Sequence, residues 1–230
     1  MQINRINISI MEDHQGIIDG YLYRLSSESA LFIAGIARYG SDLEPMLASN
    51  PTDVLILDME VPISASNPGI FPVLQVIPKI LKKNKGIKIL IISMFSQIVL
   101  IEKLVELGIA GYIFKNDAGA IQDLAQIIVS LKNGGSYFSQ GIIPKLRYLK
   151  TRSASTLLSP RQMEALSLCV AFPDSTSDDL AVRLGVSSST FRNTLSAAYD
   201  RIGVHTRRAA IYYLQKMDLG GFDSDEEPTH

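Results

Sequence analysis

Residues 54–58 read VLILD, a short apolar run that ends on a single carboxylate. Three further stretches have the same form: residues 6–13 read INISIMED, residues 87–93 read IKILIIS, and residues 111–115 read GYIFK. Short apolar runs separated by segments long enough for helices are typical of a parallel sheet with helices on both faces. We therefore predict an α/β doubly wound domain for the N-terminal part of the chain.

Polar residues stand at the ends of these runs, and they are Glu12, Asp13, Asp58, Ser93 and Lys115. Because open parallel sheets bind ligands beyond the carboxyl ends of their strands, we expect these side chains to meet on one surface. Two carboxylates about 4 Å apart repel each other by roughly 4 kcal/mol at an effective dielectric constant of about 20, so the cluster requires a cation. The combination predicts a site for a phosphoryl group and a cation, not for a dinucleotide.

In order and spacing, these residues resemble the receiver domain of bacterial two-component response regulators, over roughly residues 1–135. The resemblance implies a flavodoxin-like sheet of five parallel strands. It also implies that Asp58 accepts a phosphoryl group from a sensor histidine kinase. Glu12 and Asp13 would then bind magnesium (Mg2+) together with Asp58, since Mg2+ prefers hard oxygen ligands.

The remaining matched positions would act on the phosphoryl group once it has arrived. The resemblance implies that Lys115 pairs with phosphoryl oxygens as a compact point charge. It implies that Ser93 donates a hydrogen bond to a phosphoryl oxygen. Tyr112, three residues before the lysine, stands at the family's aromatic switch position.

Three features near Asp58 depart from the family pattern. The segment 62–69, which reads PISASNPG, is a few residues longer than the usual loop, and its composition predicts a structured turn. Met94 follows Ser93 where the family carries a very small residue, and its side chain could narrow the mouth of the pocket. Glu60 adds a further carboxylate. These departures raise the question of whether phosphorylation is required.

The composition limits the remaining possibilities. The 230 residues allow two ordinary domains, and the single cysteine, Cys169, cannot form an internal disulfide. Its apolar neighbours indicate a buried thiol and not a nucleophile. The absence of a leader and of an apolar run of about 18 residues predicts a cytoplasmic protein without membrane contact.

We expect the receiver domain to end near residue 135, after a last helix at 118–132. Residues 136–156 are predicted to form a linker that carries the basic residues Lys145, Arg147, Lys150 and Arg152. A helical domain is expected at 157–219 and a disordered acidic tail at 220–230.

The second domain has a purely helical pattern. We predict helices that begin at Ser159 and that span 178–184, 188–202 and about 207–217. Gly185 lies in the short turn between the second and third of these helices, and Ser187 is expected to cap the third. Two helices joined by a glycine-containing turn predict a helix-turn-helix.

The third helix of this domain has two different faces. Its apolar stripe, Phe191, Leu195, Ala198 and Ile202, is expected to face the core. Arginine and asparagine suit guanine and adenine edges, and serines at a helix start suit phosphate oxygens. The residues expected to contact DNA are Ser188, Ser189, Thr190, Arg192, Asn193, Ser196 and Arg201. Arg207 and Arg208 suit neutralisation of the DNA backbone.

An ordered set of residues over 157–217 is similar to the LuxR/NarL-type helix-turn-helix. The set is Leu158-Ser159-Pro160-Arg161, Glu164, Leu180-Ala181, Leu184, Val186-Ser187, Thr190, Leu195, Ile202-Gly203-Val204, Arg207 and Ala210. The resemblance implies that the third helix enters the major groove and that the fourth helps to form a homodimer through Ile211, Tyr212 and Leu214. Asp178, where a lysine is common, and Thr194, where a histidine is frequent, depart from the pattern.

The function predicted from these observations is that of a response-regulator transcription factor, not an enzyme, in which phosphorylation of Asp58 controls dimerisation and DNA binding. An atypical regulator that needs no phosphorylation is the first alternative, because of Met94 and the long loop. A phosphatase of the haloacid-dehalogenase type would need Asp-x-Asp, which Glu60 only mimics. A protein-interaction module without DNA binding is the third alternative, because of Asp178. No spacing of the three histidines and one cysteine predicts a zinc site.

Overall fold

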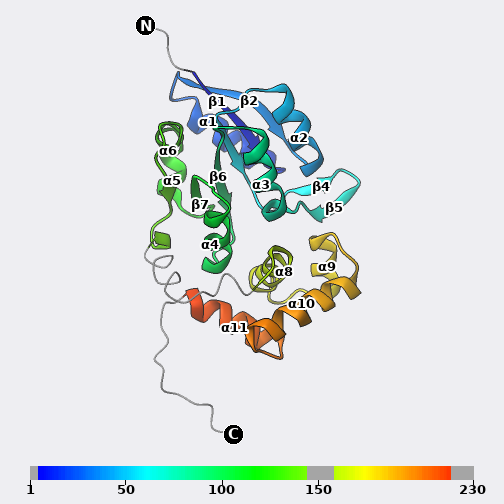
Figure 1. Ribbon diagram of the computed structural model, residues 1–230. Helices are drawn as coiled ribbons and strands as arrows, with labels where there is room; N and C mark the ends of the chain where they lie inside the picture. The colour runs from blue at the N-terminus through cyan, green and yellow to red at the C-terminus, as the bar shows by residue number, and fades with distance from the viewer. Residues whose placement is uncertain (1–4, 144–157, 219–230) are drawn as a thin grey trace.

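The computed structural model describes residues 5–143 and 158–218. A six-stranded sheet forms the centre of the N-terminal domain, in the order β2-β1-β3-β6-β7-β8, and every neighbouring pair is parallel (Figure 1). The strands are β1 (Ile6–Met11), β2 (Leu31–Ala37), β3 (Val54–Leu57), β6 (Lys88–Ser93), β7 (Gly111–Phe114) and β8 (Tyr137–Phe138). The order reverses direction at β1 and β3, so the doubly wound fold expected from the sequence is confirmed.

Helices cover both faces of this sheet. They are α1 (Gln15–Leu25), α2 (Gly40–Ser49), α3 (Val73–Lys83), α4 (Ile98–Glu106), α5 (Ala118–Gln122) and α6 (Leu124–Lys132). Side chains alternate between the two faces along each strand. Accordingly Leu55 and Leu57 of β3 join a core with α2, α3 and α4, whereas Ile56 joins a separate core with α1 and α6.

The C-terminal edge of the domain differs from the sequence-based expectation. The sheet has a sixth strand, β8, which lies in the stretch assigned to the linker and pairs with β7 through Gly111 and Tyr137. Ile142 beyond it is buried in the core. The expected helix at 118–132 is divided at Asp123 into α5 and α6. The first domain therefore extends past residue 135. The sequence did not reveal this, because a strand of two residues is too short to be recognised by alternation.

The long segment after Asp58 forms a two-stranded antiparallel hairpin, β4 (Pro62–Ser64) and β5 (Asn67–Ile70). The Ser64 hydroxyl accepts a hydrogen bond from the backbone N–H of Asn67, and Asn67 Oδ1 accepts one from the N–H of Gly69. These side-chain contacts to the backbone are the ones expected in a structured turn.

The second domain consists of α8 (Pro160–Ala171), α9 (Ser177–Leu184), α10 (Ser188–Ile202) and α11 (Arg207–Asp218). Ser159, Thr176 and Ser187 each cap the helix that follows through a side-chain oxygen, and the sequence predicts this role for Ser187. Gly185 ends α9 with φ of 69°, in the left-handed region that glycine adopts without strain.

Cys169 lies fully buried in α8, and burial raises the pKa of its thiol to about 11. The expectation of a buried, packed thiol is thus confirmed. The expected basic linker residues and the acidic tail lie outside the described residues. Within residues 5–143 and 158–218, no helix has the length and apolar character needed to cross a membrane.

Candidate functional site

Four adjacent strands of the sheet end at the same edge and bring the polar residues together there. Met11 pairs with Leu57, and Leu57 pairs with Ile91, so the residues that follow β1 and β3 lie beside the end of β6. The backbone N–H of Lys115 donates to the carbonyl of Ser93 across β6 and β7. The parallel register therefore places all four strand ends around one pocket.

Lys115 forms ion pairs with two acids of this pocket. Its Nζ lies 2.9 Å from Oδ2 of Asp58 and 2.8 Å from Oε2 of Glu12. The Asp58 side chain is 3 % exposed and that of Glu12 is 1 % exposed. Asp58 Oδ1 also accepts a hydrogen bond of 2.7 Å from the backbone N–H of Met59. Two buried carboxylates thus share one ammonium group.

The pKa of Asp58 is raised above its ordinary value, first because burial penalises the charged carboxylate, with the charge of Glu12 acting in the same direction. Lys115 opposes this change. For Lys115 burial lowers the pKa, but its ion pairs with Asp58 and Glu12 outweigh burial, so the ammonium is held in its charged form. The pocket therefore holds more negative charge than its single lysine neutralises, which favours a further cation.

Asp13 and His14 complete the acidic side of the pocket. His14 Nδ1 lies 3.2 Å from Glu12 Oε1 and 3.0 Å from Asp13 Oδ1. The pKa of His14 is raised, chiefly by the charge of Asp13. The ligand atoms of Glu12, Asp13 and His14 lie within 4.8 Å of one another. The contact of His14 with both acids depends on the turn after β1 and is not apparent from the sequence.

Ser93 and Tyr112 are joined by hydrogen bonds through Phe95. Ser93 Oγ accepts a hydrogen bond of 3.2 Å from the N–H of Phe95, and the Tyr112 hydroxyl donates one of 2.6 Å to the Phe95 carbonyl. Burial raises the pKa of Tyr112, and a hydrogen bond from Ser93 acts in the opposite direction. The expected switch residues therefore contact each other. Phe95 was missed, because nothing in its local sequence distinguishes it from core.

Glu60 and Met94 are two of the residues that depart from the family pattern near Asp58, and they have different environments. Burial and the charge of Asp58 raise the pKa of Glu60. The Met94 side chain is 58 % exposed at the surface beside the pocket. Both lie at the rim, so neither displaces Asp58 or Lys115.

The α10 helix presents the expected polar face outward. Its apolar stripe is buried at Phe191, Leu195 and Ala198 and half-buried at Ile202. Of the residues expected to contact DNA, Ser188 is half-buried and the other six are exposed. The exposed residues are Ser189, Thr190, Arg192, Asn193, Ser196 and Arg201. Part of this face is already engaged within the domain, since Thr190 contacts the capping Ser187.

Two arginines have partners that the sequence did not reveal. Arg192 Nη1 lies 3.4 Å from Asp178 Oδ1. An acid of α9 thus forms an ion pair with an arginine of α10 that is a candidate for contact with DNA bases. Arg207 donates hydrogen bonds to the carbonyls of Ser175 and Phe172. Arg207 therefore fixes the loop before α9, and its guanidinium is already engaged within the domain.

The candidate dimer residues of α11 have different environments. Tyr212 is 60 % exposed, Ile211 is half-buried, and Leu214 is 1 % exposed. α11 also contacts α4 of the first domain. Leu214 is therefore part of the core in this arrangement of the two domains.

Comparison with known proteins finds relatives in sequence and in fold. No protein-family model matches the chain. The transcriptional regulatory protein DesR of Bacillus subtilis is 27 % identical over 206 residues, which cover 90 % of this chain and 94 % of DesR. The response regulator UvrY of Escherichia coli is 23 % identical over 205 residues, covering 87 % of this chain and 89 % of UvrY.

The fold matches solved structures of the response regulator RcsB from Salmonella. One matches with a TM-score of 0.69 and 22 % identity over 93 % of this chain and 98 % of RcsB. Another, of RcsB bound to a promoter in the presence of a phosphomimetic, matches with a TM-score of 0.67 and 21 % identity over 93 % of this chain and 100 % of that chain. This likeness supports the same two-domain fold, a doubly wound domain followed by a helix-turn-helix. Over about nine tenths of its length the chain is similar in sequence to bacterial transcriptional regulatory proteins and response regulators.

Proposed function

We propose that this protein is a transcription factor in which phosphorylation of Asp58 by a sensor histidine kinase controls homodimerisation and DNA binding. The single observation that supports this most strongly is the buried contact of Lys115 with both Asp58 and Glu12, at 2.9 and 2.8 Å. A lysine that bridges two buried acids at the ends of parallel strands is placed to hold the oxygens of an added phosphoryl group. The DNA complexes of RcsB support the second half of the proposal.

The acidic pocket fits a hard divalent cation. Asp58, Glu12 and Asp13 offer carboxylate oxygens, and the charge of two buried acids exceeds that of Lys115. We assign these three residues as the ligands of Mg2+, which keeps several of its waters in such sites. When bound, Mg2+ supplies positive charge to the oxygens of the transferred phosphoryl group.

The residues of the chain then act in sequence. An oxygen of Asp58 forms a bond to phosphorus while the bond from phosphorus to the kinase histidine breaks, and the kinase nitrogen takes up a proton. Lys115 exchanges one of its carboxylate contacts for a phosphoryl oxygen. The Ser93 hydroxyl turns from Tyr112 towards the phosphoryl group, which releases one of the bonds that hold Tyr112. Tyr112 is then able to repack.

Beryllofluoride with Mg2+ tests the proposal, because it mimics the phosphoryl group without a kinase. We expect this addition to shift the protein from monomer to dimer in sedimentation analysis and to increase its affinity for promoter DNA. If oligomeric state and DNA affinity both stay unchanged, phosphorylation does not control this protein. DNA binding that needs no analogue would instead support the atypical regulator.

The contact between Asp178 and Arg192 leads to a prediction about DNA affinity. Asp178→Asn should tighten DNA binding, because it removes an acid near the phosphates and releases Arg192. The slope of log affinity against log salt should become steeper by about one unit. Stability should change little, since exposed ion pairs contribute roughly 0–1 kcal/mol. Asp200→Asn, on an exposed part of α10, is the control. Equal affinities and slopes for the two variants would contradict the role assigned to Asp178.

A further inference from the structure

The β4–β5 hairpin contacts the second domain directly. β5 packs against α9, and in the ribbon view the hairpin projects from the receiver domain towards α9 (Figure 1). The hairpin follows Asp58 by only a few residues. An antiparallel hairpin therefore lies between the candidate phosphoacceptor and the helix-turn-helix.

The hairpin and the helix-turn-helix meet at two glycines. A Cβ placed on Gly69 would lie 2.5 Å from the Cα of Gly185 and 3.0 Å from its nitrogen. A Cβ on Gly185 would lie 3.2 Å from Cδ1 of Ile63. Because the two atoms nearest to a Cβ on Gly69 belong to the backbone of Gly185, they cannot move aside as a flexible side chain would. The backbone of β5 thus sits against the turn between α9 and α10 because Gly69 has no side chain.

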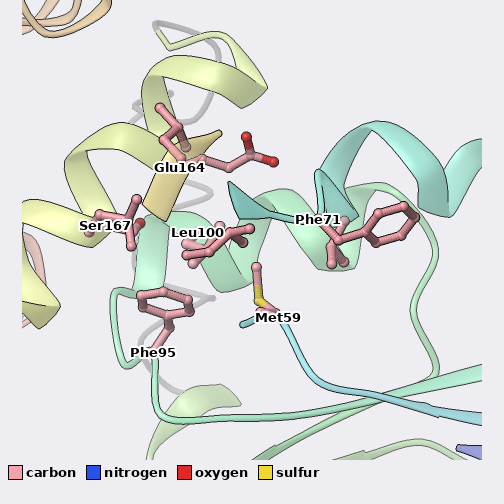
Figure 2. Close-up of a pocket in the computed structure, with 10 residues that line it drawn as sticks. Met59, Phe71, Phe95, Leu100, Glu164 and Ser167 are labelled. Atoms are coloured by element: carbon pink, nitrogen blue, oxygen red, sulfur yellow. The ribbon is translucent and has the colours of Figure 1, made fainter. Parts of the chain in front are cut away.

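The apolar cores of the two domains are continuous around this contact. Met59, Phe95 and Leu100 of the first domain and Ser167 of α8 line a cavity of about 20 Å³ (Figure 2), which Leu168 of α8 also lines. Ser167 Oγ has no hydrogen-bond partner among the described residues. The cavity and the unpaired buried hydroxyl show that packing between the two domains is incomplete at this point.

Polar contacts also join the two domains. Glu164 of α8 accepts a hydrogen bond from the backbone of Leu74 in the first turn of α3. Arg161 pairs with Glu164 at 2.8 Å and donates to the carbonyl of Leu184, next to the turn of the helix-turn-helix. A carboxylate at a helix N-terminus is stabilised by the free backbone N–H groups there. Glu164 therefore ties α8 to α3 beside the hairpin.

The docked surface is connected to the phosphoacceptor pocket by two short links. Met59, which lines the cavity, donates its N–H to Asp58. Phe95, which also lines the cavity, is hydrogen-bonded to Ser93 and Tyr112. Movement of Ser93 towards a phosphoryl group would pull on Phe95 and so disturb the packing against α8.

Docking covers α11 and leaves the recognition face open. α11 packs against α4, whereas Arg192, Asn193 and Ser196 of α10 remain exposed. The closed arrangement therefore does not block contact of a single α10 helix with DNA. It instead occupies the helix that was expected to form the dimer.

We propose that the β4–β5 hairpin is an intramolecular docking surface that holds the turn of the helix-turn-helix through Gly69 and Gly185, and thereby keeps α11 against α4 and unavailable for dimerisation. The trigger for release rests on the proposed phosphorylation of Asp58, whereas the docking itself does not.

Gly69→Ala tests this proposal in the full-length protein. The added methyl group suits a strand but cannot fit against Gly185, so we expect the ratio of docked to undocked protein to fall by about tenfold. Gly119→Ala is the matched control, because its Cβ would lie at an ordinary 3.7 Å from Asp117 Oδ1. Small-angle scattering and hydrogen exchange are measured without DNA and without a phosphate analogue.

The expected result for Gly69→Ala is a larger radius of gyration and faster exchange in the α9–α10 turn, α8 and α11, with unchanged exchange in β1, β3 and β6. The unchanged strands show that the receiver domain is folded. The variant should also dimerise more readily than the wild type in the absence of beryllofluoride. If scattering and exchange equal those of Gly119→Ala, or if the turn opens while α11 stays protected, the proposal is overturned. Failure of beryllofluoride to act on an opened variant would contradict the phosphorylation proposal alone.

Discussion

Asp58→Asn is expected to abolish the response to a phosphodonor entirely. The amide cannot form an acyl phosphate, so neither dimerisation nor the gain in DNA affinity should follow addition of a small-molecule phosphodonor with Mg2+. Asparagine has nearly the same shape and can still accept the N–H of Met59, so the fold should persist. Sedimentation and DNA binding with and without the donor measure the effect.

Asp19→Asn is the control for this substitution, since Asp19 is exposed on α1. It should respond to the donor as the wild type does. A donor-induced dimer in the Asp58→Asn protein would show that another residue accepts the phosphoryl group, or that the donor acts elsewhere. Circular dichroism of both variants establishes that any loss of response is not a loss of structure.

Lys115→Met should have the largest effect on stability. It leaves Asp58 and Glu12, at 3 % and 1 % side-chain exposure, without their shared cation. Removal of one partner from a buried ion pair costs about 3–5 kcal/mol, because the remaining charge is uncompensated. Urea unfolding at pH 7 in the presence of a chelator measures this loss in the free energy of unfolding. Lys83→Met, which breaks an exposed pair with Glu44, should change the free energy of unfolding far less, because water screens exposed ion pairs.

The loss caused by Lys115→Met should depend on pH and on Mg2+. Burial already raises the pKa of Asp58, and removal of the ammonium raises it further. The folded variant then binds a proton more tightly than the unfolded chain, so its stability falls as pH rises through this pKa. The deficit should be smallest in acid and largest near neutrality. The free energy of unfolding of the variant should be higher with Mg2+ than with a chelator. A deficit that is independent of both pH and Mg2+ would mean that these acids are not a charge cluster.

Much of the fold could be predicted because strong local signals coincide with element ends. Asp58 and Lys115 directly follow strands that the structure places at 54–57 and 111–114. Ser187 and Gly185 mark the boundaries of α10 and α9 through capping and left-handed geometry, which depend on a few neighbouring residues. Signals of this range can be read from sequence alone.

The residues that were missed depend on distant partners. Phe95 has an apolar side chain like many others, and its role comes from hydrogen bonds to Ser93 and to Tyr112, which is 17 positions away. Arg207 seemed suited to bind phosphate, but its guanidinium donates to carbonyls 32 and 35 positions away. The edge strand β8 has only two residues, so its identity comes from pairing with β7.

The sequence by itself determined the two domain types and the polar residues at the strand ends, because alternation, capping and turn chemistry act over a few residues. Only the tertiary structure decided that Lys115 bridges Glu12 and Asp58, that Asp178 holds Arg192, and that Gly69 lies against Gly185. Each of these contacts joins separate elements, and its energy depends on distance and burial. The distances and the burial are set only when the helices have packed against the sheet and the two domains against each other.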